Sequence, residues 1–463
     1  MNDHILFLTG QLAEPSLRRV LGQMDLGDTT WTVRQLGVKV AALMTADMIR
    51  RRLTDTAGAD RIIIPGRCRG DLGALSEHFG VPVERGPEEL MDLPRFFGLA
   101  GRTPDLSAYA VRIFAEIVDA PRLSVDAILG RATEYRAEGA DVIDLGCLPD
   151  TPYPHLDESV RALKAAGFLV SVDSMEPAEL LSGGRAGADF LLSLSEDSLW
   201  IADQVAACPV LIPRQPGDLA SLERAMARLD VAGRPYLADP ILDPIHFGFA
   251  DSLVRYHTLR RAHPTAPIMM GVGNLTELTE ADTMGINALL MGLISELDIG
   301  NILTTQVSPH CRTAIREADR ARRIMHWARQ EGRLPKQIDG GLTALHERDP
   351  FPYPMEQIRD LAAAIRDPNF RIQVSAQGVH CFNRDGFHTN DDPFAFYPHL
   401  GAEQDAGHAF YLGVELARAQ IARQLGKRYV QDQPLHWGCV LPPVVTATDT
   451  YDAVGTTRQR LEP

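Results

Sequence analysis

The chain has 463 residues, of which 45% are hydrophobic, and this is enough apolar material for two or three domains with cores of their own. The formal net charge of −15 argues against a nucleic-acid partner and against an anionic membrane surface. We expect neither a signal peptide nor a membrane span, because no apolar run has the length or the flanks of either. The six cysteines are widely spaced and form no CxxC pair, which favours a cytoplasmic protein with reduced thiols.

Residues 1–105 are expected to form a small Rossmann-like α/β domain. The hydrophobic pattern predicts two buried strands and an amphipathic helix between them, at residues 5–8, 61–64 and 41–53. The glycine-rich loop at residues 65–70 carries Arg67 and Arg69, and such a loop can bring backbone N–H groups and guanidinium groups to a phosphate. Turns explain these glycines more simply, because the sequence has no GxGxxG or GxxxxGK spacing.

Residues 106–335 are expected to form a (β/α)₈ TIM barrel. Eight strand-like segments alternate with helical ones over about 220 residues, whereas a doubly wound open sheet would usually stop earlier. The predicted strands are residues 111–118, 141–146, 168–173, 190–194, 210–213, 235–239, 268–272 and 301–306. Two of them follow a Gly-Ala-Asp sequence whose glycine, Gly139 or Gly187, suits the left-handed residue that ends a helix.

Residues 336–463 are expected to form a C-terminal α+β domain with an extended tail. The pattern predicts a strand at residues 368–374 and an amphipathic helix at residues 409–425, ended by Gly426. Several metal-ligating residue types also fall in this region, at His380, Cys381, His388, His399 and His408. Their spacing matches no compact metal motif, so packing is the favoured interpretation.

Five aspartates stand at the carboxyl ends of predicted barrel strands or in the loops just beyond, namely Asp119, Asp144, Asp173, Asp239 and Asp243. Parallel α/β proteins bind ligands at those strand ends, so we expect a shared pocket there. A carboxylate accepts two parallel hydrogen bonds from a planar N–H and NH₂ pair, which makes a guanidine-like heterocycle a natural ligand. Clustered carboxylates also suit Mg²⁺, and sequence spacing does not distinguish the two uses.

The motifs that carry these acids resemble those of a known family. The stretches Glu-Gly-Ala-Asp-Val-Ile-Asp-Leu-Gly at 138–146, Ser-Val-Asp-Ser at 171–174 and Ile-Leu-Asp-Pro at 241–244 resemble the strand motifs of dihydropteroate synthase and the wider pterin-binding barrel family. The resemblance covers residues 108–330. It implies a barrel rim that binds a hydroxymethyl-dihydropterin diphosphate, from which an arylamine displaces the diphosphate and forms a C–N bond.

The same resemblance implies roles for individual residues. Catalytic roles would fall to Asp119, Asp144 and Asp173. Contacts to the pterin would come from Asp144, Asp173, Ser193, Asp239, Asp243 and Asn274. Asp239 and Asp243 remain alternatives for the acid that pairs with the pterin amine edge, one by its strand end and the other by its motif.

The sequence also departs from the synthase pattern. The first-strand Asn motif is replaced by Ile-Val-Asp-Ala-Pro at 117–121, so a metal or diphosphate role there would pass to Asp119, a possible Mg²⁺ ligand. Ser193 stands in place of the fourth-strand Asn. The seventh-strand loop reads Gly-Val-Gly-Asn and ends on Asn274, closer to the methyltetrahydrofolate-binding methyltransferases. A departing diphosphate develops charge that catalysis must stabilise, so the missing Lys, Arg and His weaken the synthase interpretation more than pterin binding.

The three-part layout and the C-terminal motifs at 409–426 and 429–438 resemble dihydropteroate-synthase-related proteins of organisms that make tetrahydromethanopterin. That resemblance implies a ribofuranosylaminobenzene phosphate as the arylamine and a homodimer as the assembly. Candidate ligands for its phosphate are Arg67, Arg69, His310 and Arg312. Three functions stay open: a pterin-to-arylamine transferase in tetrahydromethanopterin or folate-like biosynthesis, a methyl-pterin-dependent methyltransferase, and a noncatalytic pterin-binding or scaffold subunit.

Overall fold

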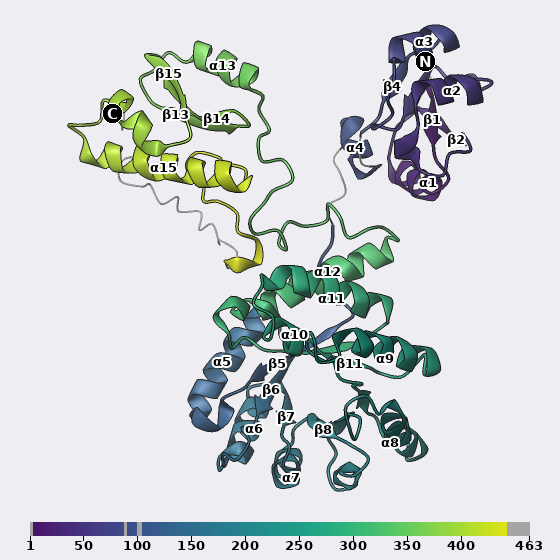
Figure 1. The fold of residues 1–463 in the computed structure, drawn as a ribbon, viewed down its shortest axis with the longest axis vertical. Coiled ribbons are helices and arrows are strands. Elements are labelled where there is room, and N and C mark those ends of the chain that lie inside the picture. The colour runs from purple at the N-terminus through teal and green to yellow at the C-terminus, as the bar shows by residue number, and fades with distance from the viewer. Residues whose placement is uncertain (1–2, 88–89, 100–103, 442–463) are drawn as a thin grey trace. The chain divides into compact units, whose positions relative to one another are not determined.

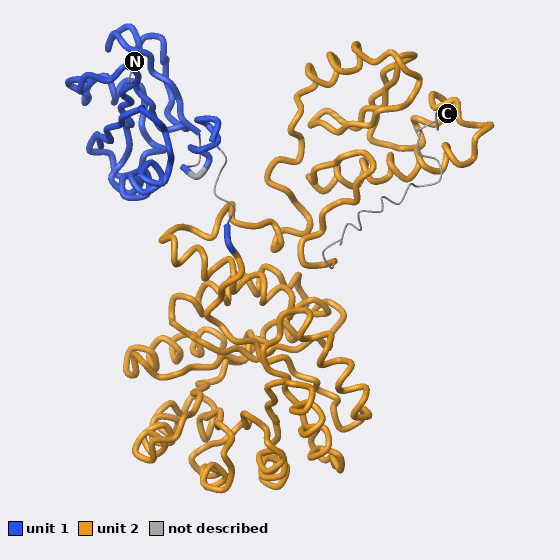
Figure 2. Tube along the Cα trace, turned by 180° about the vertical axis from the view of Figure 1, so that it is seen from behind, with its two compact units in different colours: residues 1–105 blue, residues 106–463 orange. Residues whose placement is uncertain are grey.

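The structure, a computed structural model, divides by its internal contacts into two compact units, residues 1–105 and 106–463 (Figure 2). It describes residues 3–87, 90–99 and 104–441. The predicted tail lies largely on residues 442–463, outside the described residues, and the boundary near residue 335 stays a prediction within the second unit. None of the helices among the described residues has the length and apolar character needed to cross a membrane.

The first unit is built on a four-stranded parallel sheet with the order β2-β1-β3-β4. Its strands are β1 (His4–Thr9), β2 (Thr30–Gln35), β3 (Arg61–Ile64) and β4 (Val83–Arg85). Helices cover both faces: α2 (Ala46–Arg52) and α3 (Leu72–Phe79) share one apolar core with alternate strand residues, and α1 (Glu14–Gln23) shares the other. This two-sided burial explains why the two predicted strands are continuous apolar runs.

The helix predicted at residues 41–53 is shorter than expected. Residues 41–43 form a separate 3₁₀ turn, and α2 begins only after Thr45, whose side chain accepts a hydrogen bond of 3.3 Å from the Met48 N–H. A Thr side chain that caps a helix in this way fixes the helix start, so the apolar period extends further than the helix itself.

The second unit contains a barrel of eight parallel strands, which confirms the predicted TIM-barrel class (Figure 1). The ladder runs β10-β9-β8-β7-β6-β5-β12-β11, and a bridge between Ala238 and Ile268 joins its two ends. The strands are β5 (Arg112–Ile117), β6 (Val142–Gly146), β7 (Leu169–Asp173), β8 (Phe190–Leu194), β9 (Cys208–Leu211), β10 (Leu237–Ala238), β11 (Met269–Gly271) and β12 (Asn301–Thr304).

Helices alternate with these strands and form the outer layer of the barrel. They are α5 (Val125–Glu138), α6 (Leu156–Ala165), α7 (Pro177–Ala186), α8 (Leu219–Val231), α9 (Phe249–Ala262), α11 (Thr283–Glu296) and α12 (Ala314–Gln330). Gly139 and Gly187 end α5 and α7 with φ values of 114° and 105°, a left-handed backbone that favours glycine. Both glycines therefore have the structural role expected of them.

Side chains alternate along the barrel strands between two cores. One apolar cluster fills the barrel interior with Phe114, Val142, Phe190, Leu192, Val210, Leu237 and Met269. The residues between them, such as Ala115 and Ile143, pack in the larger core beneath the helices. Because strand side chains point to opposite faces with a period of two, this interior layer fixes which side chains project into the barrel mouth further along each strand.

A buried arginine joins the last barrel helix to the first barrel strand. Arg322 in α12 donates to the carbonyl oxygen of Val111 at 2.6 Å and is bonded to the carboxylates of Asp141 and Asp319. Its guanidinium also lies 3.6 Å from the ring centroid of Tyr109. The side chain is 1% exposed, so this cation depends entirely on protein partners.

A three-stranded antiparallel sheet and a long helix form the C-terminal part of the second unit. The sheet contains β13 (Arg371–Ser375), β14 (Gly378–Asn383) and β15 (Gly386–Asn390), and α15 (Ala406–Leu425) packs on it before ending at Gly426. The predicted strand and helix are present, whereas β14 and β15 were not predicted. His380 is buried between the hydroxyl groups of Ser375 and Thr389 at 2.7 and 2.8 Å, as a packed core histidine would be.

Replacing the buried arginine is expected to destabilise the barrel strongly. Arg322→Ala leaves the Asp141 carboxylate without its cation, whereas Asp319 keeps Arg323, and loss of one partner of a buried pair lowers the free energy of unfolding by about 3–5 kcal/mol. Urea unfolding of the variant and the wild type measures this loss. The matched control is Arg329→Ala in the same helix, because Arg329 is 53% exposed and pairs with Asp298 at the surface, where the loss is at most about 1 kcal/mol. Equal losses in both variants would contradict the prediction.

Candidate functional site

Three acids project from neighbouring strands at the carboxyl end of the barrel. Glu116 in β5 and Asp144 in β6 are directly paired across the parallel ladder, and each stands two residues beyond an interior residue. Asp173 ends β7, next in the ladder. The three side chains each have a carboxylate oxygen within 4.8 Å of the other two. We call these residues the acid triad.

Asp144 is the most deeply buried member of the triad, with no exposed surface. Its Oδ1 accepts a short hydrogen bond from the hydroxyl of Ser171, the residue paired with Asp144 in the neighbouring strand β7. Its Oδ2 is buried without a hydrogen-bond partner. An unsatisfied buried polar atom costs about 1–3 kcal/mol, and native proteins tolerate such atoms mainly where a ligand, an ion or a special function is served.

Burial and the charges of nearby acids raise the pKa of every acid in the triad. Burial, followed by the charges of Asp173 and Glu277, raises the pKa of Glu116 to about 8. Burial and the charge of Asp239 raise the pKa of Asp173 to about 7. The pKa of Asp144 lies well above its ordinary value for the same two causes, although the Ser171 hydrogen bond acts in the opposite direction. In the absence of a cation, the triad therefore retains protons near neutral pH.

Asp239 is a fourth acid of this site and follows directly after β10. Its Oδ1 accepts hydrogen bonds of 2.7 Å from the Tyr256 hydroxyl and from the Ile241 N–H. Burial raises its pKa to about 6, against the effect of these two hydrogen bonds. The charge of Asp239 in turn acts on Asp173, so the two acids face the same region of the rim.

Asp243 has a different environment from Asp239. Its carboxylate is bonded to Arg255 in α9, and the same guanidinium donates to the carbonyl oxygens of Pro240 and Ile241. Arg255 thus holds the loop after β10 in place and neutralises Asp243. Of the two alternatives for the acid of a pterin amine edge, Asp243 is paired with Arg255, whereas the charge of Asp239 acts on Asp173 of the triad.

The other residues expected at the rim lie outside the triad. Asp119 is in the 3₁₀ turn after β5, with its side chain 45% exposed and its carboxylate 2.9 Å from Arg131. Ser193 lies in β8, partly buried, where the pairing with β9 is irregular. Asn274 lies in the short helix α10 (Gly273–Thr276), where its side-chain N–H donates to the Leu242 carbonyl at 2.9 Å.

The four residues expected to bind phosphate fall in two separate places. His310 lies in the turn after β12, with Nε2 3.1 Å from the Thr276 carbonyl oxygen, and Arg312 is exposed just beyond it. Arg67 and Arg69 belong to the first unit. Arg69 lines a hollow of about 430 Å³ there, together with Asp47, Arg50 and Asp71. The mixed charges of this hollow do not single out an anion.

Two acids of this site were not predicted from the sequence. Glu116 lies inside its strand rather than at the end, and the signal that identifies it is its position two residues after the interior Phe114. Glu277 follows α10 and accepts hydrogen bonds from the N–H groups of Val307 and Ser308, at 2.8 and 3.0 Å. It joins the loops after β11 and β12, and its charge acts on Glu116.

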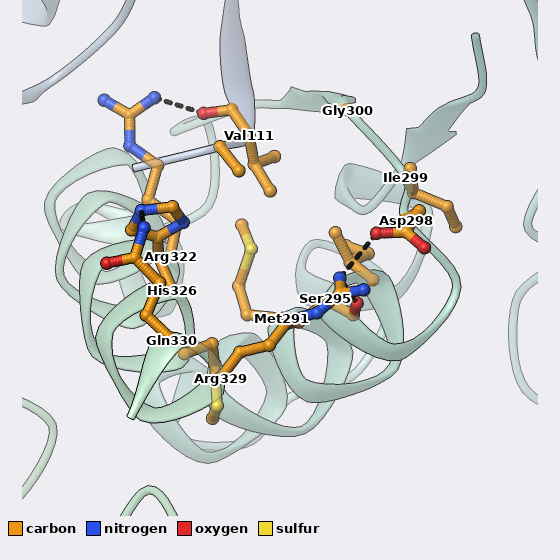
Figure 3. A pocket seen from close by; sticks show the side chains of 13 residues that line it. Val111, Met291, Ser295, Asp298, Ile299, Gly300, Arg322, His326, Arg329 and Gln330 are labelled. Carbon is orange, nitrogen blue, oxygen red and sulfur yellow. Dashed lines mark hydrogen bonds and ion pairs between the residues drawn. The ribbon is translucent and has the colours of Figure 1, made fainter. Parts of the chain in front are cut away.

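A pocket of about 560 Å³ opens at the opposite end of the barrel strands, between α11 and α12 (Figure 3). Its charged groups already have partners: Arg322 bonds the Val111 carbonyl, and Arg329 bonds Asp298. TIM-barrel active sites lie at the carboxyl ends of the strands, whereas residues at the amino ends serve stability. The acid-rich rim is therefore the candidate functional site.

Comparison with known proteins gives a match to a protein family, to a protein sequence and to solved structures. Residues 3–88 match a family described as "Family of unknown function (DUF6513)". The chain is 26% identical to "Uncharacterized protein MJ0107" of Methanocaldococcus jannaschii, over 92% of this chain and 98% of that protein. Among solved structures, the chain is similar to a dihydropteroate synthase from Yersinia pestis, with 19% identity over 49% of this chain and 95% of that one and a TM-score of 0.37. It is also similar to a dihydropteroate synthase from Thermus thermophilus, with 22% identity over 47% of this chain and 92% of that one and a TM-score of 0.35. We therefore infer a function from the residues of the rim.

The raised pKa values predict a pH-dependent stability that Glu116→Gln removes in part. The folded state holds the Glu116 proton up to about pH 8, whereas an ordinary glutamate releases it near pH 4.5, so folding loses stability as the pH rises between these values. Relative to the wild type in EDTA, Glu116→Gln should gain about 1 kcal/mol or more between pH 5 and pH 8, as urea unfolding measures. The exposed control Asp203→Asn, which loses a surface pair with Arg228, should show no such gain. A gain of the same size in both variants would contradict the assignment.

Proposed function

We propose that the carboxyl-end rim of the barrel binds a reduced pterin. The observation that carries this proposal is the convergence of Asp144, Asp173 and Asp239 there, where burial raises the pKa of all three acids. The 2-amino-4-oxo edge of a pterin offers an adjacent N–H and NH₂ pair, which matches one carboxylate in a bidentate geometry. The motif resemblance at residues 138–146 and 171–174 supports the same ligand class.

Asp239 is the proposed partner of the pterin amine edge. The Tyr256 hydroxyl and the Ile241 N–H hold its Oδ1, so its orientation is set before a ligand arrives. Such preorganisation lowers the entropic cost of binding. Asp173 would face a ring N–H group, and an acid with a pKa near neutrality can both accept and donate hydrogen bonds there.

The proposed reaction is the transfer of the pterin to an arylamine. The amine nitrogen would form a C–N bond with the methylene carbon of a hydroxymethyl-dihydropterin diphosphate, the C–O bond would break, and the diphosphate would leave with the electron pair. The amine proton would pass to a base, for which Asp173 has a suitable pKa of about 7. The resemblance of the three-part layout suggests a ribofuranosylaminobenzene phosphate as the amine and tetrahydromethanopterin or folate-like biosynthesis as the setting.

Two alternatives have an observation in their favour. A noncatalytic pterin-binding role is favoured because arginines near the strand ends are already paired, Arg131 with Asp119, Arg214 with Asp197 and Arg255 with Asp243, which leaves them poorly placed for a diphosphate. A methyl-pterin methyltransferase is favoured by the loop that ends on Asn274, whose amide is oriented by the Leu242 carbonyl.

Replacing the acid of the amine edge should weaken pterin binding without unfolding the protein. Asp239→Asn removes the charge from a hydrogen bond at Oδ2 that is worth about 1.5–3 kcal/mol, so the dissociation constant for a reduced pterin should rise about 10- to 100-fold. Fluorescence titration of the full chain measures this, with Asp203→Asn as the control that should leave binding unchanged. If Asp239→Asn binds the pterin as tightly as the wild type and Asp243→Asn binds it more weakly, then Asp243 is the partner of the pterin amine edge.

Turnover separates the three functions. Incubation with hydroxymethyl-dihydropterin diphosphate and an arylamine should release diphosphate and form a pteroate-like product, which chromatography detects. Asp173→Asn should reduce the rate about 100- to 10,000-fold if Asp173 is the general base. Tight pterin binding with no product from any arylamine would leave the noncatalytic role, and methyl loss from a methylated pterin would support the methyltransferase.

A further inference from the structure

We infer that the acid triad of Glu116, Asp144 and Asp173 binds one divalent cation of the oxygen-preferring kind, Mg²⁺ or Mn²⁺. The site differs from Asp119, the residue singled out in the sequence as a possible Mg²⁺ ligand, because the carboxylate of Asp119 is occupied by Arg131. The first observation is geometric: each triad residue places a carboxylate oxygen within 4.8 Å of the other two. Oxygens that share a Mg²⁺ ion lie about 3–4 Å apart, so rotations of the side chains bring the three into a coordination sphere.

The second observation is the unpartnered oxygen of Asp144. Asp144 is fully buried, and Ser171 supplies its only hydrogen bond among the described residues, at Oδ1. Its Oδ2 has no donor. A cation bound by the triad would give this oxygen the partner that the protein does not provide. One bound ion would then account both for the unpartnered oxygen and for the convergence of three carboxylates.

The surroundings of the triad are negative. Within the described part of the chain, the charges that raise the pKa of its members all come from acids: the other triad members, Glu277 beside Glu116, and Asp239 beside Asp173. Glu277 is not a free ligand, because N–H groups of the loop after β12 occupy its oxygens. A bound divalent cation supplies the countercharge that no neighbouring side chain contributes.

The backbone leaves room for this arrangement at Gly146. A Cβ atom there would lie 2.5 Å from Glu116 Oε1, 3.0 Å from Val118 Cα and 3.2 Å from the Ile117 carbonyl oxygen. Gly146 has no left-handed backbone that would otherwise require glycine. Its lack of a side chain is thus explained by the close approach of the Ile117 and Val118 backbone together with the Glu116 carboxylate.

The cation would also complete the proposed function. If the rim binds a pterin diphosphate, a metal ion at the triad supplies the positive charge toward phosphate oxygens that Arg131 and Arg255, both paired with acids, do not. This role rests on the proposed function, whereas cation binding itself does not. The two are therefore tested separately.

Titration of the EDTA-stripped full chain with Mn²⁺ alone, followed by electron paramagnetic resonance and calorimetry at pH 8, tests the cation site. One Mn²⁺ per chain should bind, and Glu116→Gln should weaken it at least tenfold. Glu277→Gln is the matched control, since it removes a charge that acts on Glu116 without removing a ligand, and it should change the affinity by less than the triad variant does. The inference would be overturned if Mn²⁺ binding did not saturate, or if the two variants changed the Mn²⁺ affinity equally. The triad would then be a cluster of acids that hold protons and no cation.

Folding and pterin binding are checked in the same proteins. Circular dichroism and the unfolding midpoint establish that Glu116→Gln is folded, as its expected gain in stability predicts. A reduced pterin is then titrated in EDTA. Pterin binding without Mn²⁺ binding overturns the cation site alone, whereas Mn²⁺ binding without pterin binding upholds the cation site and removes the proposed function.

Discussion

The pairing register of β5, β6 and β7 is the constraint on which the rim depends. Parallel pairing sets Glu116 opposite Asp144 and Asp144 opposite Ser171, and the alternation of side chains directs them to the barrel interior side. A slip of one residue in any of these strands would turn its acids toward the helices and move its apolar interior side chains to the helix-covered side. The large helix-covered core therefore fixes the position of acids that repel one another.

Acids of the same type have opposite roles in this barrel, and the difference lies in whether a guanidinium reaches them. Asp119, Asp141 and Asp243 are each bonded to an arginine and serve as anchors for turns and helices. Asp144 and Asp173 have no such cation among the described residues, and burial together with the charges of neighbouring acids raises their pKa values. Carboxylates that anchor turns or helices and carboxylates left without a cation are thus told apart by their partners and not by their place in the sequence.

The sequence predicted the architecture better than the composition of the site. Eight strand segments were visible because parallel barrel strands are continuous apolar runs with glycine-ended helices between them. The hairpin of β14 and β15 was missed because its polar residues and its histidines suggested a loop. Asp239 and Asp243 were inseparable since each precedes a proline, and only Arg255, a dozen residues beyond Asp243, distinguishes them through a tertiary contact.

Glu116 also could not be identified as a site residue from the sequence alone. Acids that end a strand attract notice, whereas an acid within a strand is identified only when the interior face of the strand is known, and that face depends on the packing of the whole barrel. The cap at Thr45 is a local signal of the opposite kind, because a Thr side chain and one N–H group three residues later are enough to start a helix.

The Arg322 network also constrains how the chain folds during synthesis. Asp141 leaves the ribosome 181 positions before the arginine that neutralises it, and Val111 leaves 211 positions before the same guanidinium. At translation rates of about 5–20 residues per second, the first strands wait roughly 10–40 s for the helix that completes their bonding. The first and last segments of the barrel are therefore joined only at the end, so a nascent chain that stops before α12 leaves a half-buried carboxylate without its cation.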